Sequence, residues 1–281
     1  MGLSYRLEDY AAYRDAVGAA TYIDITRRSD PARRPTAWDH LREVVDAYGA
    51  PWVAQLWTKD VAGALALGAG LLERLRAEGT TLTAQVTITG LAGSAWEPLT
   101  PGDTVSRLQD LARVLGGPEH ITWRYDPIIP TVHDDETFAR LARGVAAQGV
   151  RRGVINFLAA PGRYRRVDRR LNELLPGWGA GMPGYDADWT EHTARALVDR
   201  AAAEGISLGC CAESCRLAGK VTGLRRAACG DYGWFAALSG RYPSVTARRG
   251  SRPGCGCVRY FDVGNYGGWA SCHRCAYCYA G

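Results

Sequence analysis

The chain has 281 residues, of which 47% are hydrophobic and 22% charged, and its formal net charge is +5. This is the composition of a soluble globular protein long enough for one large α/β barrel or two modest domains. No stretch approaches the roughly 18 apolar residues of a membrane helix, and the N-terminus lacks the apolar core of a signal peptide. These features exclude a membrane protein, and we expect a cytoplasmic one.

Residues 20–210 alternate short β-branched or aromatic runs with alanine- and leucine-rich helical stretches. Strands are expected at 21–26, 52–58, 82–89, 121–128, 153–158 and 206–211. Helices are expected between them at 37–47, 62–77, 105–114, 136–147 and 191–203. This is a βα unit repeated six times, which predicts a parallel sheet. A closed eightfold barrel needs roughly 250 residues. We therefore expect an α/β fold with a partial (βα)6 TIM-like barrel over residues 1–210. A cysteine- and glycine-rich segment without a βα period, residues 211–281, would pack on the barrel mouth.

Polar side chains follow the predicted strands, at the end where parallel barrels carry their chemistry. Arg124 and Asp126 are two residues apart on one strand and so share a face. There the arginine can clamp a carboxylate, and the aspartate can orient it or accept a proton. The alternative is a structural ion pair, but the position before Pro127 at a strand end favours function. Lys59 also ends a strand, and a solvated lysine is an equally good interpretation of it.

Two further strand-end segments hold candidate ligands. Glu97 follows the third predicted strand and can bind an amine, although a single loop glutamate is more often structural. Cys211 and Glu213 share a face at the end of the sixth strand. Cys210 then points into the helix layer, and we expect it to be a buried core thiol.

The nine cysteines are clustered, which favours metal ligation over disulfides in a reducing compartment. Cys272, Cys275 and Cys278 are each separated by two residues. Three thiolates can hold three corners of an iron–sulfur cube and leave the fourth iron open. Zinc prefers four closed ligands, and His273 would complete only a cramped zinc site. Spacing alone therefore leaves iron–sulfur and zinc equally well supported.

Seven motifs, in one order along nearly the whole chain, resemble an uncharacterised bacterial family, number 1848 among the domains of unknown function. The last of them runs from Cys255-Gly256-Cys257 through residues 262–266 to residues 272–280. The other six are TRRSDP at 26–31, LWTK at 56–59, QVTITG at 85–90, WRYDPI at 123–128, CAE at 211–213 and CGD at 229–231.

The terminal cysteines of that family resemble the cluster loop of radical S-adenosylmethionine (SAM) enzymes. The resemblance implies a partial barrel of radical SAM type whose 4Fe–4S cluster is held by Cys272, Cys275 and Cys278. The family pattern has three residues between the first two of these cysteines, whereas this chain has two. The match also implies a second set of ligands for an auxiliary 4Fe–4S cluster or a structural zinc: Cys211, Cys229, Cys255 and Cys257.

The resulting hypothesis is a radical SAM enzyme, a transferase or lyase, that reductively cleaves SAM to modify a small polar substrate. The products would be a deoxyadenosyl radical or a transferred aminocarboxypropyl group, and a carrier such as flavodoxin or ferredoxin would supply the electron. The expected catalytic residues are Arg124, Asp126 and Lys59, and the expected SAM-binding residues are Thr89, Glu97, Arg124 and Glu213. The alternative is a zinc- or cluster-stabilised, non-catalytic barrel that binds nucleic acid or another ligand, but the arginines are scattered and form no basic tract.

Overall fold

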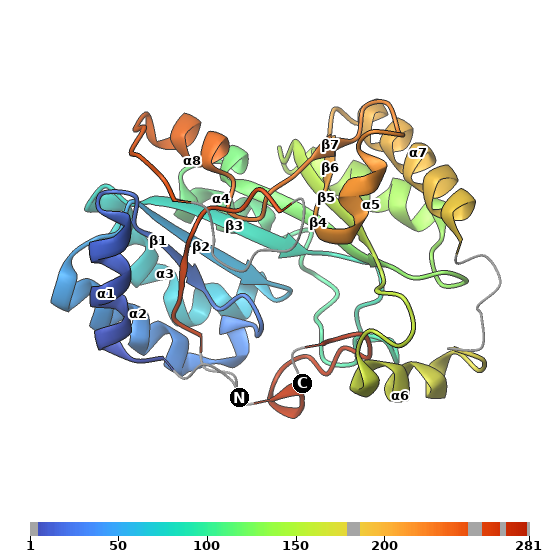
Figure 1. Ribbon diagram of the computed structural model, residues 1–281, viewed down its shortest axis with the longest axis horizontal. Helices are drawn as coiled ribbons and strands as arrows, with labels where there is room; N and C mark the ends of the chain where they lie inside the picture. Colours follow the sequence, from blue (N-terminus) through green and yellow to red (C-terminus); the bar gives the residue numbers. More distant parts are fainter. Residues whose placement is uncertain (1–4, 179–185, 247–254, 265–267, 280–281) are drawn as a thin grey trace.

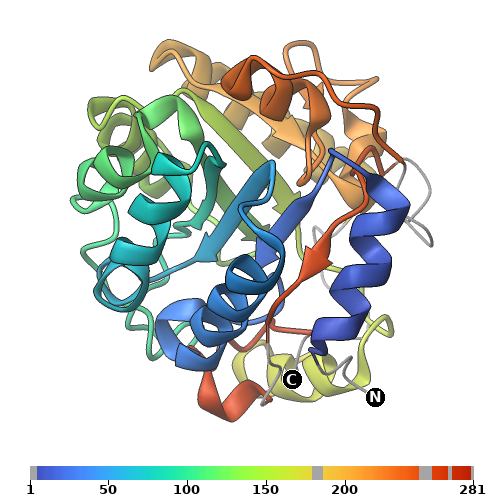
Figure 2. The same cartoon turned by 90° about the vertical axis from the view of Figure 1, so that its left-hand side faces the viewer.

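The computed structural model describes residues 5–178, 186–246, 255–264 and 268–279, without the side chains of residues 212 and 213. Its centre is one eight-stranded, entirely parallel sheet in the order β7-β6-β5-β4-β3-β2-β1-β8 (Figures 1 and 2). The strands are β1 Tyr22–Ile25, β2 Val53–Thr58, β3 Thr81–Thr87, β4 Ile121–Ile128, β5 Arg152–Phe157, β6 Ser207–Cys210, β7 Arg225–Arg226 and β8 Phe261–Asp262.

Helices connect each pair of successive strands from β1 to β6, as expected for parallel neighbours. They are α1 Leu7–Val17, α2 Pro35–Tyr48, α3 Val61–Ala77, α4 Leu108–Leu115, α5 Asp135–Ala147, α6 Arg165–Leu174, α7 Ala187–Ala203 and α8 Tyr232–Ser239. Short 3-10 turns lie at Pro31–Arg33, Pro118–His120, Ala212–Leu217 and Trp269–Ser271. No helix in the described part of the chain is both long enough and apolar enough to span a membrane.

All six predicted strands are confirmed, each within two residues at either end, and so are the five predicted helices within four residues. Residues 211–281, for which no βα period was expected, nevertheless contain regular elements. This segment supplies β7, α8 and β8, and it adds a strand to each edge of the sheet. Two-residue strands are too short to show a hydrophobic period, which explains why the sequence pattern did not reveal them.

The two faces of the sheet have different chemistry, because side chains alternate along each strand. The apolar face packs against α1–α5 and α7 in the main core, through residues such as Ile23, Leu56 and Val86. Cys210 belongs to this core and is fully buried, which confirms the expectation of a core thiol. The other face is polar and is lined by the buried side chains of Asp24, Gln55, Gln85 and Arg124.

At the amino ends of β1 and β2 the polar face is covered by α8. Phe235 and Ala236 of α8 pack against Tyr22, Trp52 and Val53 in a second, smaller core. Figure 1 shows the chain crossing from β7 to α8, and Figure 2 shows β8 beside β1. The amino ends of β1 and β2 are therefore closed on this face by apolar packing.

Candidate metal centre

Arg124 and Asp126 do share one face at the carboxyl end of β4, and they form an ion pair. The Arg124 side chain is buried, with 7% of its surface exposed. Its guanidinium also lies 3.4 Å from Gln85 Oε1, 3.6 Å from Cys229 Sγ and 3.8 Å from Cys211 Sγ. All of these Arg124 contacts are with other groups of the protein, whereas the Asp126 side chain is 24% exposed and so reaches solvent. Of the pair, Asp126 is the group that can meet a ligand.

Cys211, Cys229 and Cys257 meet on the polar face beside Arg124. The Sγ atoms of Cys211 and Cys229 are 3.9 Å apart, and Cys257 also contacts the thiol of Cys229. Hydrogen bonding with Cys211 and Cys257, together with the charges of nearby guanidiniums, holds the pKa of Cys229 below its usual range. Cys255, the fourth predicted ligand, is partly buried and interacts electrostatically with Cys215.

A second buried ion pair, which the sequence analysis missed, lies next to this thiol cluster. Asp24 Oδ2 is 2.6 Å from Arg27 Nη2, and the Arg27 guanidinium stacks 3.8 Å from the ring of Tyr260. Burial raises the pKa of Asp24 to about 6, against the opposing effect of Arg27. The signal was present in the sequence, since an aspartate between Ile23 and Ile25 in a short apolar strand is costly unless it has a partner.

Two other predicted site residues, Lys59 and Thr89, meet around Glu97, which is 1% exposed. Glu97 Oε1 accepts hydrogen bonds from Lys59 Nζ at 3.0 Å, from Thr89 Oγ1 at 2.5 Å and from the hydroxyl of Tyr277. Lys59 Nζ also donates to Tyr277 Oη at 2.8 Å. Burial alone would raise the pKa of Glu97, but Lys59 and the hydrogen bonds outweigh it and lower that pKa. We call Lys59, Thr89, Glu97 and Tyr277 the Glu97 cluster.

The Glu97 cluster attaches the C-terminal cysteine loop to the carboxyl ends of β2 and β3, because Tyr277 lies between Cys275 and Cys278. A second attachment is His273, which is 1% exposed. Its Nε2 lies 2.8 Å from Asp30 Oδ2, after β1, and its Nδ1 lies 3.0 Å from the carbonyl oxygen of Leu99. Both ring nitrogens have partners, so His273 is a structural contact of this loop.

The backbone of the loop is held as well. Trp269 Nε1 donates to the Cys275 carbonyl at 2.8 Å, and the amide of Ala276 donates to the Trp96 carbonyl at 3.0 Å. Arg170 of α6 donates to the carbonyls of Ala276 and Cys278. Cys275 is buried, and burial raises the pKa of its thiol to about 12, so metal binding there must displace a proton.

The donor chemistry of both cysteine sets fits a metal or a cluster, although neither forms a finished cage. In the part of the chain that the structure describes, no three His, Cys, Asp or Glu side chains are arranged to hold a metal ion. The three C-terminal thiols nevertheless interact electrostatically with one another, and the Lys59 ammonium lies beside Cys275. Of the remaining predicted site residues, the side chain of Glu213 lies outside the described residues.

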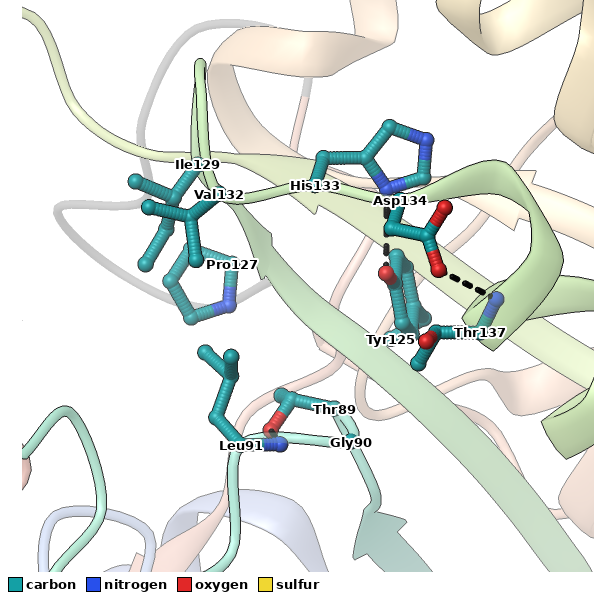
Figure 3. A pocket seen from close by; sticks show the side chains of 10 residues that line it. All are labelled: Thr89, Gly90, Leu91, Tyr125, Pro127, Ile129, Val132, His133, Asp134 and Thr137. Atoms are coloured by element: carbon teal, nitrogen blue, oxygen red, sulfur yellow. Dashed lines mark hydrogen bonds between the residues drawn. The ribbon is translucent and has the colours of Figure 1, made fainter. Parts of the chain in front are cut away.

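A small cavity lies on the opposite side of β4 from Arg124. It has a volume of about 70 Å³ and is lined by residues that include Thr89, Tyr125, His133 and Thr137 (Figure 3). Inside it, Tyr125 Oη is 3.0 Å from His133 Nδ1. A larger depression of about 550 Å³ lies at the amino ends of β1 and β2. Of the predicted site residues, Thr89 lines the small cavity and none lines the larger depression. Neither space therefore coincides with the predicted site.

Comparisons with known proteins place the chain in a family. A comparison with curated proteins finds no match. Among solved structures, the carboxyl transferase domain of Rhizobium etli pyruvate carboxylase with 3-hydroxypyruvate aligns at 13% identity, covering 83% of this chain and 48% of that one. The chain thus spans about half of that structure, and a TM-score of 0.28 is too low to bear on fold or function. The family model of the Domain of unknown function (DUF1848) matches residues 39–280, and the chain belongs to that family.

Proposed function

We propose that this chain is an iron–sulfur enzyme of radical SAM type, in which Cys272, Cys275 and Cys278 hold a 4Fe–4S cluster with one open iron. The observation that carries the proposal is the attachment of this loop to residues that follow β1, β2 and β3, through His273–Asp30 and the Glu97 cluster. The carboxyl ends of parallel strands are where α/β enzymes carry their chemistry. A cysteine loop fixed there would present a cluster to the polar face of the sheet.

A partial barrel is the arrangement that best accounts for the sheet. The strands follow one another in sequence from β1 to β7 without reversal, and the main core packs helices against a single face. A doubly wound sheet would reverse its order and carry helices on both faces. The buried polar side chains of the other face would then be the barrel interior, closed at its amino end by α8.

The two cysteine sets are connected through charged groups of the protein. Asp126 interacts electrostatically with Lys59, beside Cys275, and also with Cys211. Lys59 would offset the negative charge of the C-terminal thiolates, and Glu97 and Tyr277 would hold Lys59 in place. Asp126, as the more exposed member of its ion pair, would contact a small polar substrate. When bound, a cluster of this kind supplies the electron for reductive cleavage of the SAM sulfonium.

The test is anaerobic purification followed by iron and sulfide counting and by incubation with dithionite and SAM. We expect a brown protein that releases 5′-deoxyadenosine or methylthioadenosine, and the product identifies which carbon–sulfur bond breaks. Cys275→Ala should abolish both the colour of this cluster and SAM cleavage. Cys215→Ala is the matched control, because the Cys215 thiol is buried and donates to the Cys210 carbonyl. A colourless protein that leaves SAM intact would contradict the proposal.

A further inference from the structure

We infer that Cys211, Cys229, Cys255 and Cys257 bind a single tetrahedral zinc ion and not an auxiliary iron–sulfur cluster. The inference concerns a different set of residues from the C-terminal loop. It does not depend on the proposed function, and a separate metal analysis tests it.

The separation of two sulfur atoms distinguishes the two kinds of site. The Sγ atoms of Cys211 and Cys229 are 3.9 Å apart. Zinc–sulfur bonds of about 2.3 Å in a tetrahedron place neighbouring thiolates about 3.8 Å apart. In a 4Fe–4S cube each thiolate binds a different iron, so the thiolates stand farther apart, on separate corners. The observed separation is a hydrogen-bond contact between the two thiols, and its length matches the spacing of two ligands to one zinc ion better than that of two cluster ligands.

The remaining ligands come from the chain just before β8. Cys257 contacts the thiol of Cys229, and the amide of Gly230 donates to Cys257 Sγ at 3.4 Å. Such backbone donors fix the orientation of metal-bound thiolates. Cys255 lies two residues earlier, so in an extended chain its side chain is on the same side as that of Cys257. Cys215 interacts electrostatically with both Cys255 and Cys229, which brings Cys255 into this region.

The charge of the surroundings suits a buried tetrathiolate. Four thiolates around a divalent ion leave two negative charges, which are costly to bury without compensation. Arg124 donates to both Cys229 Sγ and Cys211 Sγ, and Arg27 lies within electrostatic reach of Cys229 and Cys257. One guanidinium therefore contacts the sulfur atoms directly, and a second favours their negative charge from a distance.

The other two cysteines of the region are engaged elsewhere. Cys210 Sγ donates to the Arg225 carbonyl, and Cys215 Sγ donates to the Cys210 carbonyl at 3.1 Å. A disulfide does not account for the cluster, since a bond of about 2.05 Å would require Cys211 and Cys229 to move together. A zinc ion here would join the end of β6, the chain after β7 and the chain before β8.

The test is metal analysis of the full chain purified anaerobically with zinc and iron both supplied. We expect about one zinc ion per chain, with four zinc–sulfur bonds of about 2.3 Å in the X-ray absorption spectrum. Cys229→Ser and Cys257→Ser should lose the zinc. Cys215→Ala and Cys275→Ala should keep it, and Cys275→Ala alone should lower the iron content.

About eight iron atoms per chain, falling to about four in Cys229→Ser, would overturn the inference in favour of a second cluster. Protein that holds no zinc after supplementation would overturn it as well. The absorption spectrum is recorded on the unmodified chain, so a variant that fails to fold does not decide the question. Zinc without any iron would contradict the proposed function and leave the zinc site intact.

Discussion

Replacing Tyr277 by phenylalanine removes one hydroxyl group that joins the C-terminal cysteine loop to the rest of the protein. This hydroxyl donates to Glu97 and accepts from Lys59 at 2.8 Å. Glu97 is almost fully buried and the Lys59 side chain is 14% exposed, so water cannot readily replace the lost partner. A hydrogen bond to a charged group contributes about 1.5–3 kcal/mol. Opening of the loop should therefore become roughly tenfold to a hundredfold more frequent.

The assay is the rate at which iodoacetamide alkylates Cys275 in the metal-free protein, followed by mass spectrometry of the C-terminal peptide. Cys275 is 7% exposed, so it must leave its packed position to react. Tyr279→Phe is the matched control, because Tyr279 is 53% exposed and phenylalanine preserves its stacking on Tyr164. Equal alkylation rates in Tyr277→Phe and the unmodified chain would refute the role of the Glu97 cluster, as would equal acceleration by both variants.

Three further predictions concern stability, each measured by urea unfolding. Gly68→Ala should destabilise the protein although alanine favours helices, because the new Cβ would lie 2.2 Å from the Trp38 ring. Gly70→Ala is the control in the same helix: its Cβ meets nothing, so it should stabilise the protein by about 1 kcal/mol. Stabilisation by both variants would show that Trp38 moves freely. Asp60→Ala should cost about 1 kcal/mol, since its carboxylate caps α3 by accepting from the amide of Gly63 at 2.8 Å, and no loss would mean that the cap is not formed in solution. Asp24 has a folded-state pKa of about 6, above its unfolded value, so its stabilising effect is complete below about pH 4 and is lost as the pH rises through 6. The stability of the unmodified chain relative to Asp24→Asn should fall by about 1.4 kcal/mol between pH 5 and pH 7.5, and a constant or rising difference would contradict the raised pKa.

Local sequence patterns were sufficient for the six strands β1 to β6 and for most of the helices. The strand predicted at 121–128 is observed as Ile121–Ile128, because its β-branched and aromatic run is bounded by clear turn residues. α6 escaped notice because Val167 and Leu171 are its only buried side chains among many charged ones. α8 is eight residues long and lies in a glycine-rich region without a repeating pattern.

The candidate site was predictable as a set of residues but not as an arrangement. Arg124 and Asp126 are near neighbours on one strand, so strand geometry alone placed them together. Lys59 and Glu97 are 38 residues apart, and Glu97 and Tyr277 are 180 residues apart. No local rule pairs side chains over such distances, because only the folded sheet brings the strand ends to one edge. Lys59 and Glu97 were accordingly proposed for separate roles, although they form a single buried ion pair.

The position of β8 beside β1 has a consequence for the synthesis of this protein. The contact between Asp30, which follows β1, and His273 cannot form until the ribosome has made the 243 residues from one to the other. At about 5–20 residues per second, the ribosome needs roughly 10–50 s to make the intervening chain. Throughout that interval the outer edge of β1 has no strand to pair with, since β8 is its partner on that side. Unpaired strand edges join with other chains. The yield of native protein should therefore depend on protection of the nascent chain, and slower synthesis without added chaperones should lower it.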